Sequence, residues 1–189
     1  MDLRDELRRK THPLHAKVET VFEPVDIRTS GGLRRFLLAH HAAIAPIERR
    51  LSEVGGAWSG CWPFRLKDLL VADLQTLDVR DRPTVWRGDL AVAHPLGLCY
   101  VLGGSRLGAR LLLKRLSGGP GYRPARPSYL ASAPDDAIWT WTKRLLASDR
   151  ARSVNRQDVL SAAESAFSCF AEALALVETP GERHDAVAL

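Results

Sequence analysis

Four side chains near the start of the chain have the types and spacing to hold a ligand together. Arg8, His12, His15 and Glu19 follow one another at steps of four, three and four residues, so on an α-helix they share one stripe. A neutral imidazole is a good ligand for iron, and His15 lies at the edge of the neighbouring apolar stripe, where a buried ligand would be met. Arg8 precedes His15 by roughly 10 Å along a helix axis and suits a ligand carboxylate. The stripe therefore predicts a metal ligand, although an isolated histidine is more often a structural or surface residue.

A second unusual segment carries glycines on one face of a predicted helix. Gly97, Tyr100, Gly104 and Gly108 share that face by their spacing of three to four residues. Each interior glycine costs roughly 1 kcal/mol relative to alanine, so a face with several of them needs a reason. The usual reason is close approach of the backbone to a neighbour. That neighbour is either another helix or a planar cofactor with Ser105 facing it.

Other kinds of site fit the sequence less well. His12, His15 and Glu19 could bind zinc, but no fourth ligand is evident and the HExxH motif is absent. His40 and His41 are adjacent, so they point apart on a helix and are interpreted as packing or surface residues. No histidine has a glutamate three residues before it, as di-iron bundles require, and no phosphate-binding or dinucleotide-binding loop is present.

Composition limits the class of protein. A chain of 189 residues that is 46% hydrophobic can bury a substantial core in one domain, which excludes a disordered chain. The formal net charge is +5, but the basic residues are scattered and form no recognised nucleic-acid motif, so no nucleic-acid partner is expected. The charge fits a solvated surface, an anionic small ligand or an acidic redox partner.

Three sequence features predict a cytoplasmic protein without a membrane partner. The longest apolar runs are interrupted by charge before they could span a bilayer. Residues 1–6 are charged and lack the apolar core of a signal peptide. Cys61, Cys99 and Cys169 are widely separated, which favours reduced thiols.

The hydrophobic periodicity is helical almost throughout, and no convincing strand pair appears. We therefore expect an all-α fold with one domain over 1–178, a polar tail over 179–189, and Asn155 as an N-cap. Segment 80–94 is expected to be a loop or a short helical turn, and 118–127 a surface loop. The predicted helices span 2–22, 31–54, 66–77, 95–117, 134–148 and 155–178.

Two motifs resemble a known family. Residues 7–19, with the pattern Leu-Arg-x-x-Thr-x-x-x-His-x-x-x-Glu, resemble the proximal-helix signature of haem oxygenases. Residues 100–108, with the pattern Tyr-Val-Leu-x-Gly-Ser-x-Leu-Gly, resemble the distal helix of the bacterial branch associated with bacteriophytochromes. Segments 36–51 and 163–170 are also similar to that family, so the resemblance covers nearly the whole chain in the right order. It implies a single-domain, multihelical haem oxygenase-like bundle.

The resemblance also assigns roles to individual residues. His15 would be the proximal ligand of the haem iron, and Gly104, Ser105 and Gly108 would be the catalytic positions over the distal face. The remaining haem-binding positions implied by the resemblance are Arg8, Tyr100 and Lys143.

The implied activity is the oxidative cleavage of haem to biliverdin, carbon monoxide and Fe(II). Haem would be both substrate and cofactor, and O2 the co-substrate. Electrons would come from a separate ferredoxin or reductase, because the chain has no flavin or nicotinamide motif. A bacteriophytochrome is an implied recipient of the biliverdin, and a monomer is the expected oligomeric state.

The sequence departs from the family pattern at two positions of the distal helix. Ala109 stands where the family usually has a further glycine, and Gly103 where this branch often has glutamate. The methyl group of Ala109 would crowd the distal side unless a relaxed helix absorbs it. Two alternatives therefore stay open: a haem-binding or haem-sensing protein on the same fold without turnover, and a helical interaction module that binds no haem.

Overall fold

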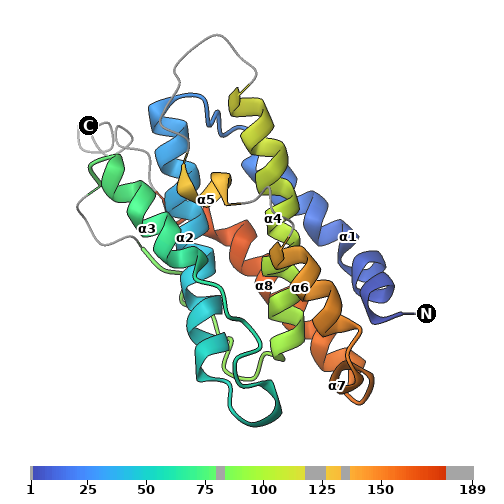
Figure 1. Ribbon diagram of the computed structural model, residues 1–189. Helices are drawn as coiled ribbons and strands as arrows, with labels where there is room; N and C mark the ends of the chain where they lie inside the picture. Colours follow the sequence, from blue (N-terminus) through green and yellow to red (C-terminus); the bar gives the residue numbers. More distant parts are fainter. Residues whose placement is uncertain (1, 80–83, 118–126, 133–136, 178–189) are drawn as a thin grey trace, which may run out of the picture.

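The computed structural model describes residues 2–79, 84–117, 127–132 and 137–177, and within these ranges every regular element is a helix (Figure 1). This confirms the predicted all-α class. The long helices are α1 (Leu3–Phe22), α2 (Ser30–Glu53), α3 (Leu66–Thr76), α4 (Pro95–Ser117), α6 (Ala137–Leu146) and α8 (Arg156–Ala173). The short ones are η1 (Gly56–Trp58), α5 (Ser128–Ala131) and α7 (Asp149–Arg152).

Helix α8 is the centre of the bundle, and α1, α2 and α4 all pack against it. Its inner positions include the small residues Ala162, Ala163 and Ala166, all buried, which let neighbouring backbones come close. Helix α2 supplies fully buried side chains such as Leu37 and Ile44. Burial of each of these large side chains stabilises the fold by roughly 1.5–3 kcal/mol. Helices α1 and α4 make little contact with each other, so α8 is what relates their positions.

The helices predicted from periodicity all exist, and the differences lie at their ends. Asn155 caps α8 as expected, since its side chain accepts a hydrogen bond from the Gln157 backbone N–H. Helix α8 nevertheless ends at Ala173 rather than at 178. Residues 84–94 contain no helix, in agreement with the predicted loop. The predicted tail 179–189 and residues 118–126 of the predicted surface loop lie outside the described residues.

Helix α3 begins where it does because of a carboxylate from another helix. Its own N-cap, Arg65, makes no side-chain capping bond. Instead Glu48 of α2 accepts hydrogen bonds from the backbone N–H groups of Leu66 (2.8 Å) and Lys67 (3.0 Å) and from the Trp62 indole (2.9 Å). A negative charge at a helix N-terminus is stabilising, so Glu48 joins α2, α3 and the loop between them.

The apolar helix α4 bears on the membrane question. Its segment Pro95–Lys114, 20 residues with a mean hydropathy of 1.2, is long and apolar enough to cross a bilayer. Half of that segment is buried inside the protein, as the core helix of a soluble protein also would be. Length and composition of this one helix are therefore weak grounds for or against a membrane location.

Candidate functional site

The stripe predicted on the first helix exists in the structure as an exposed face of α1. Arg8, His12, His15 and Glu19 are all exposed. The side chain of His15 is 59% exposed, and its Nδ1 lies 3.5 Å from Glu19 Oε1. The imidazole also meets the ring of Phe167 on α8 in an edge-on arrangement, with the ring centroids 6.1 Å apart. His15 thus stands at the junction of α1 and α8 with a free side toward solvent.

The glycines of α4 separate into two groups by what surrounds them. A Cβ at Gly97 would lie 2.3 Å from the Val159 carbonyl oxygen of α8, and one at Gly103 would lie 2.1 Å from Thr142 Oγ1 of α6. Both distances are far below any real contact of a Cβ atom. These two glycines are therefore explained by helix packing, the alternative that the glycine pattern left open. Gly97 lies on the same helical face as Gly104, seven residues further on, so the two glycines differ in their neighbours and not in their face.

Gly104 and Gly108 have no such neighbour. A Cβ at either position would meet no atom of the described residues within 4 Å. Leu107 and Leu111 lie on the same stripe of α4 and are 37% and 59% exposed. This half of the glycine face is therefore an open, apolar surface whose backbone a flat ligand can approach closely.

The methyl group of Ala109 does not project onto this open surface. Its side chain is 3% exposed and belongs to the hydrophobic core, about 100° around the helix from Gly108. The Ala109 methyl group therefore does not crowd the open surface, because it points into the core. At Gly103, the other departure from the family pattern, the backbone packs closely against Thr142.

Helix α1 runs along α8 in the same N-to-C direction as α8 itself. Glu6 pairs with Arg156 at the start of α8 (Oε2 to Nη1, 2.7 Å). Further along, His15 meets Phe167. The two contacts follow the same order along both helices, so α1 and α8 run parallel, as Figure 1 shows.

Helix α4 packs on the same part of α8 as α1 does. A Cβ at Gly97 would lie against Val159 and Ala163. His15 of α1 contacts Phe167, which is four residues beyond Ala163. The exposed imidazole and the open glycines therefore stand on two helices that pack on neighbouring turns of α8.

A chain of ring contacts connects α4 to α8. The guanidinium of Arg106 lies 4.3 Å from the centre of the Tyr129 ring. The Tyr129 ring lies beside His40 (5.6 Å), and His40 lies beside Phe170 of α8 (5.7 Å). Arg106 is thus linked to the core of the bundle through Tyr129 and His40.

This cluster of buried polar groups was missed at the sequence level. Arg106 is 3% exposed, and its Nε and Nη1 have no hydrogen-bond partner among the described residues. Burial lowers the pKa of His40 to about 4 and raises the pKa of Tyr129 above its usual range. The only available signal was an arginine within an apolar stretch of α4.

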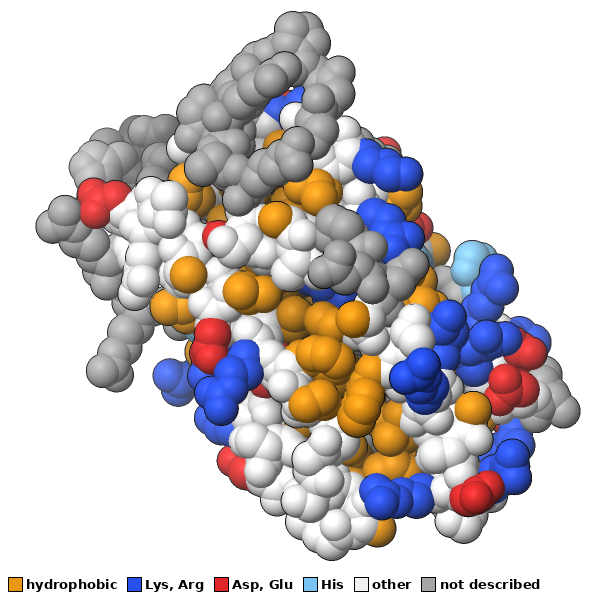
Figure 2. Space-filling model, in the orientation of Figure 1, with side chains coloured by type: hydrophobic (Ala, Val, Ile, Leu, Met, Phe, Trp, Pro, Cys, Tyr) orange, Lys and Arg blue, Asp and Glu red, His pale blue; other side chains and the backbone are white. Residues whose placement is uncertain are grey.

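The remaining predicted binding residues lie on three different helices, α1, α4 and α6. Tyr100 lies near Trp139 of α6 (ring centroids 6.3 Å apart), and Lys143 follows Trp139 by one turn. Lys143 and Arg8 are both exposed. Figure 2 shows hydrophobic side chains gathered over α4 and α6, with Lys and Arg side chains along one border. Ser105 donates a hydrogen bond to the Leu102 carbonyl of its own helix (2.7 Å).

Within the described ranges, no three His, Cys, Asp or Glu side chains gather into a metal site. A haem iron needs only one or two ligands from the protein, because the porphyrin supplies the others. The exposed imidazole of His15 has the chemistry of such a ligand.

Comparisons with known proteins leave the family open. No protein-family model matches the chain, and neither the curated proteins nor the solved structures contain a significant match.

Proposed function

We propose that this protein is a biliverdin-producing haem oxygenase, which cleaves haem with O2 and external electrons. One observation carries the proposal: an exposed imidazole, His15 on α1, and an open glycine face, Gly104 and Gly108 on α4, stand on two helices that both pack on α8. A planar ligand between the two helices would explain both features. Bound haem would supply the iron that activates O2 and the porphyrin carbon that is oxidised.

His15 would bind the haem iron through Nε2. Its Nδ1 faces the Glu19 carboxylate, and such a carboxylate partner keeps the proton on Nδ1 and leaves the lone pair of Nε2 available. Contact with the Phe167 ring restricts rotation of the imidazole. Ligand orientation would thus come from one residue of α1 and one of α8.

The other residues of the site would position the substrate. Gly104 and Gly108 would let the backbone of α4 approach the distal face, with Ser105 beside them. The cationic side chains of Arg8 and Lys143 would attract the haem propionates, which are carboxylates. Tyr100, held near Trp139, would line the same side.

The cellular setting that we propose follows from the reaction. A ferredoxin or a reductase would deliver electrons to a monomeric protein in the cytoplasm, and the biliverdin would pass to an acceptor such as a bacteriophytochrome. The net positive charge suits an acidic redox partner.

A second candidate is a haem-binding or haem-sensing protein that does not turn over. The hydroxyl of Ser105 favours it, because that hydroxyl already donates to the Leu102 carbonyl. Ser105 can still accept a hydrogen bond from water, but its proton is engaged, and Gly104 and Gly108 offer no side chain to replace it.

Reconstitution with hemin distinguishes these functions. The proposal predicts a Soret band on addition of hemin and then conversion to biliverdin when ferredoxin, ferredoxin reductase and NADPH are supplied under air. A stable Soret band without pigment conversion would establish the second candidate instead. Absence of any Soret change would contradict both and leave a helical interaction module.

A further inference from the structure

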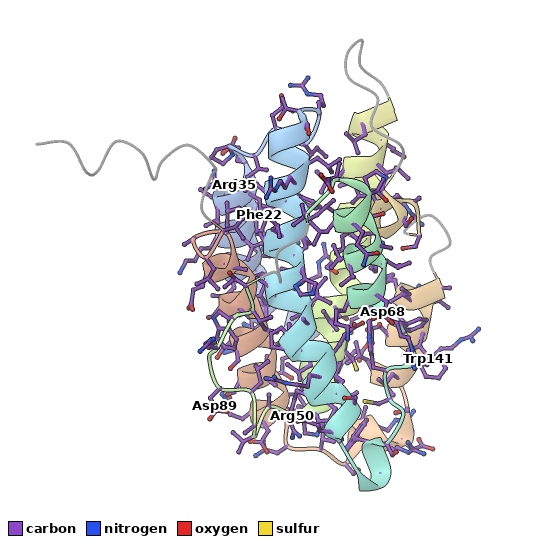
Figure 3. All side chains as sticks on the ribbon, turned by 90° about the vertical axis from the view of Figure 1, so that its left-hand side faces the viewer. Phe22, Arg35, Arg50, Asp68, Asp89 and Trp141 are labelled. Atoms are coloured by element: carbon purple, nitrogen blue, oxygen red, sulfur yellow. The ribbon has the colours of Figure 1, made fainter. Side chains whose placement is uncertain are left out.

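A cavity of about 630 Å³ lies between α2, the loop before α3 and the first turn of α3. Figure 3 faces the side where α2 and α3 lie next to each other, with Asp68 at the start of α3. Ligand-binding cavities in proteins usually measure about 300–1,000 Å³. The space is therefore large enough for a small organic molecule.

One wall of the cavity is a single stripe of α2. His41, Ala45, Glu48 and Ser52 line it, at spacings of four, three and four residues. The opposite wall is formed by the loop before α3 and the first turn of α3, to which Glu48 is hydrogen-bonded. This arrangement makes the cavity part of the fold, because the same carboxylate caps α3 and binds the loop.

The apolar part of the cavity is rigid and aromatic. The indole of Trp62 is held by its hydrogen bond to Glu48 (2.9 Å) and by the edge-on ring of Phe64, with centroids 5.0 Å apart. Pro46 and Val85 also line the cavity. A flat hydrocarbon ring would find a preorganised surface here, since aromatic side chains favour stacked or edge-on contacts.

The polar part of the cavity carries an excess of positive charge. Arg49, Arg65 and Lys67 line it together with two carboxylates. Both oxygens of Glu48 are already used by three N–H groups, and Asp68 is shared between Arg65 (3.8 Å) and Lys67 (3.7 Å). Arg49 is exposed and has no carboxylate partner among the described residues. An anionic group would therefore meet uncompensated cations.

His41 is a buried polar side chain in the wall of the cavity. It is 6% exposed, and its Nδ1 has no hydrogen-bond partner within the described part of the chain. Burial and the nearby Lys67 ammonium lower the pKa of His41, which favours the neutral ring. The histidine therefore adds no positive charge to that of Arg49, Arg65 and Lys67.

We propose that this cavity binds a small aromatic carboxylate, with its ring against Trp62 and Pro46 and its carboxylate beside Arg49 and Lys67. None of these residues belongs to the haem site proposed above. The proposal for this cavity therefore does not depend on haem binding.

Calorimetric titration with 2-naphthoate tests the proposal on the full chain, both free and loaded with hemin. We expect one molecule bound per chain, with the same affinity in both forms. The Lys67→Gln variant should bind about tenfold more weakly, as expected for the loss of one charged hydrogen bond. Lys17→Gln, an exposed change on α1, is the matched control and should bind as the wild type does.

Each of the following results would overturn the proposal. One is equal affinity for 2-naphthamide, which has the same ring without the charge. Another is unchanged affinity of Lys67→Gln, and the third is failure of 2-naphthoate to bind or its displacement by hemin. Tighter binding of hexaglutamate would assign the cavity to an acidic peptide instead, and would also contradict a small aromatic ligand. Because Lys67 is a surface residue, the Lys67→Gln variant should fold, and circular dichroism verifies this. A shift of the Trp62 indole NMR resonance on addition of 2-naphthoate would show that the ligand binds in this cavity.

Discussion

The imidazole of His15 and the ring of Phe167 meet edge-on with their centroids 6.1 Å apart, and this contact relates the predicted iron ligand to the rest of the bundle. Phe167 is buried in α8, so the position of His15 is set by the core and not by α1 alone. Helix α4, which carries the open glycines, packs on the same helix through Gly97. The candidate site is thus built on α8 although no residue of α8 was assigned to it.

Replacement of His15 by alanine is expected to weaken hemin binding by at least about tenfold, because the iron loses its only protein ligand in the proposed site. The measurement is a spectroscopic titration of the Soret band. His12→Ala is the matched control, since His12 is an exposed histidine on the same helix. Equal effects of the two substitutions, or an unchanged spectrum of His15→Ala, would show that His15 is not the ligand.

Alanine at the glycines of α4 should have effects of opposite sign on stability. Gly104→Ala and Gly108→Ala are expected to raise the free energy of unfolding by about 0.5–1 kcal/mol each, because the methyl group enters open space and alanine favours the helix. Gly97→Ala is expected to lower it by about 1–3 kcal/mol, because the methyl group would collide with the Val159 carbonyl. Urea denaturation measures all three. Similar losses at Gly97 and Gly104 would mean that the face at Gly104 is packed.

Stability should fall as the pH decreases from 6.5 to 4 because of His40. Burial, opposed by a backbone hydrogen bond with Phe36 and assisted by the Arg106 cation, lowers the pKa of His40 to about 4. The unfolded chain therefore takes up a proton near pH 6.5 that the folded chain accepts only near pH 4. The contribution is fully present above pH 6.5, and up to about 3 kcal/mol is lost as the pH falls through this window.

The His40→Phe variant provides the control for this pH dependence. Phenylalanine suits the surrounding rings of Phe22, Phe36 and Phe170, so the variant should remain folded. Urea denaturation between pH 7 and 4.5 should show a shallower decline for His40→Phe than for the wild type. A smaller decline should remain, since the pKa values of His41 and His94 are also lowered by burial. Parallel curves for the two proteins would refute the assignment to His40.

Removal of the Asp73 carboxylate should destabilise the protein by about 2–4 kcal/mol. Asp73 is 7% exposed and accepts hydrogen bonds from the N–H groups of Ser128 (2.7 Å) and Tyr129 (2.8 Å) at the start of α5. Asp73→Ala leaves both groups without partners. Asp68→Ala, on the same helix but in exposed ion pairs, should change stability by less than about 1 kcal/mol. Comparable losses for the two variants in urea denaturation would contradict this role of Asp73.

The helices themselves could be predicted wherever a long apolar period exists, and this covers all six long helices. Helix α5 could not be predicted, because it has four residues and is held by Asp73 at its start and by Arg106, which donates to the Tyr129 carbonyl, near its end. The cap of α3 was missed for the same reason, since Glu48 lies 18 residues before the N–H group of Leu66. Local patterns do not record a partner from another helix.

The sequence alone determined the all-α class, the exposed stripe of His15 and the unusual number of glycines in α4, because helical period and backbone propensity are local properties. Only the tertiary structure decided which glycines serve packing and which remain open, since that depends on whether Val159, Thr142 or empty space lies opposite each one. It likewise decided that Ala109 points into the core and that His41 lines a cavity. The physical reason is that burial and contact are set by neighbours distant in sequence, whose positions follow from how helices pack on α8.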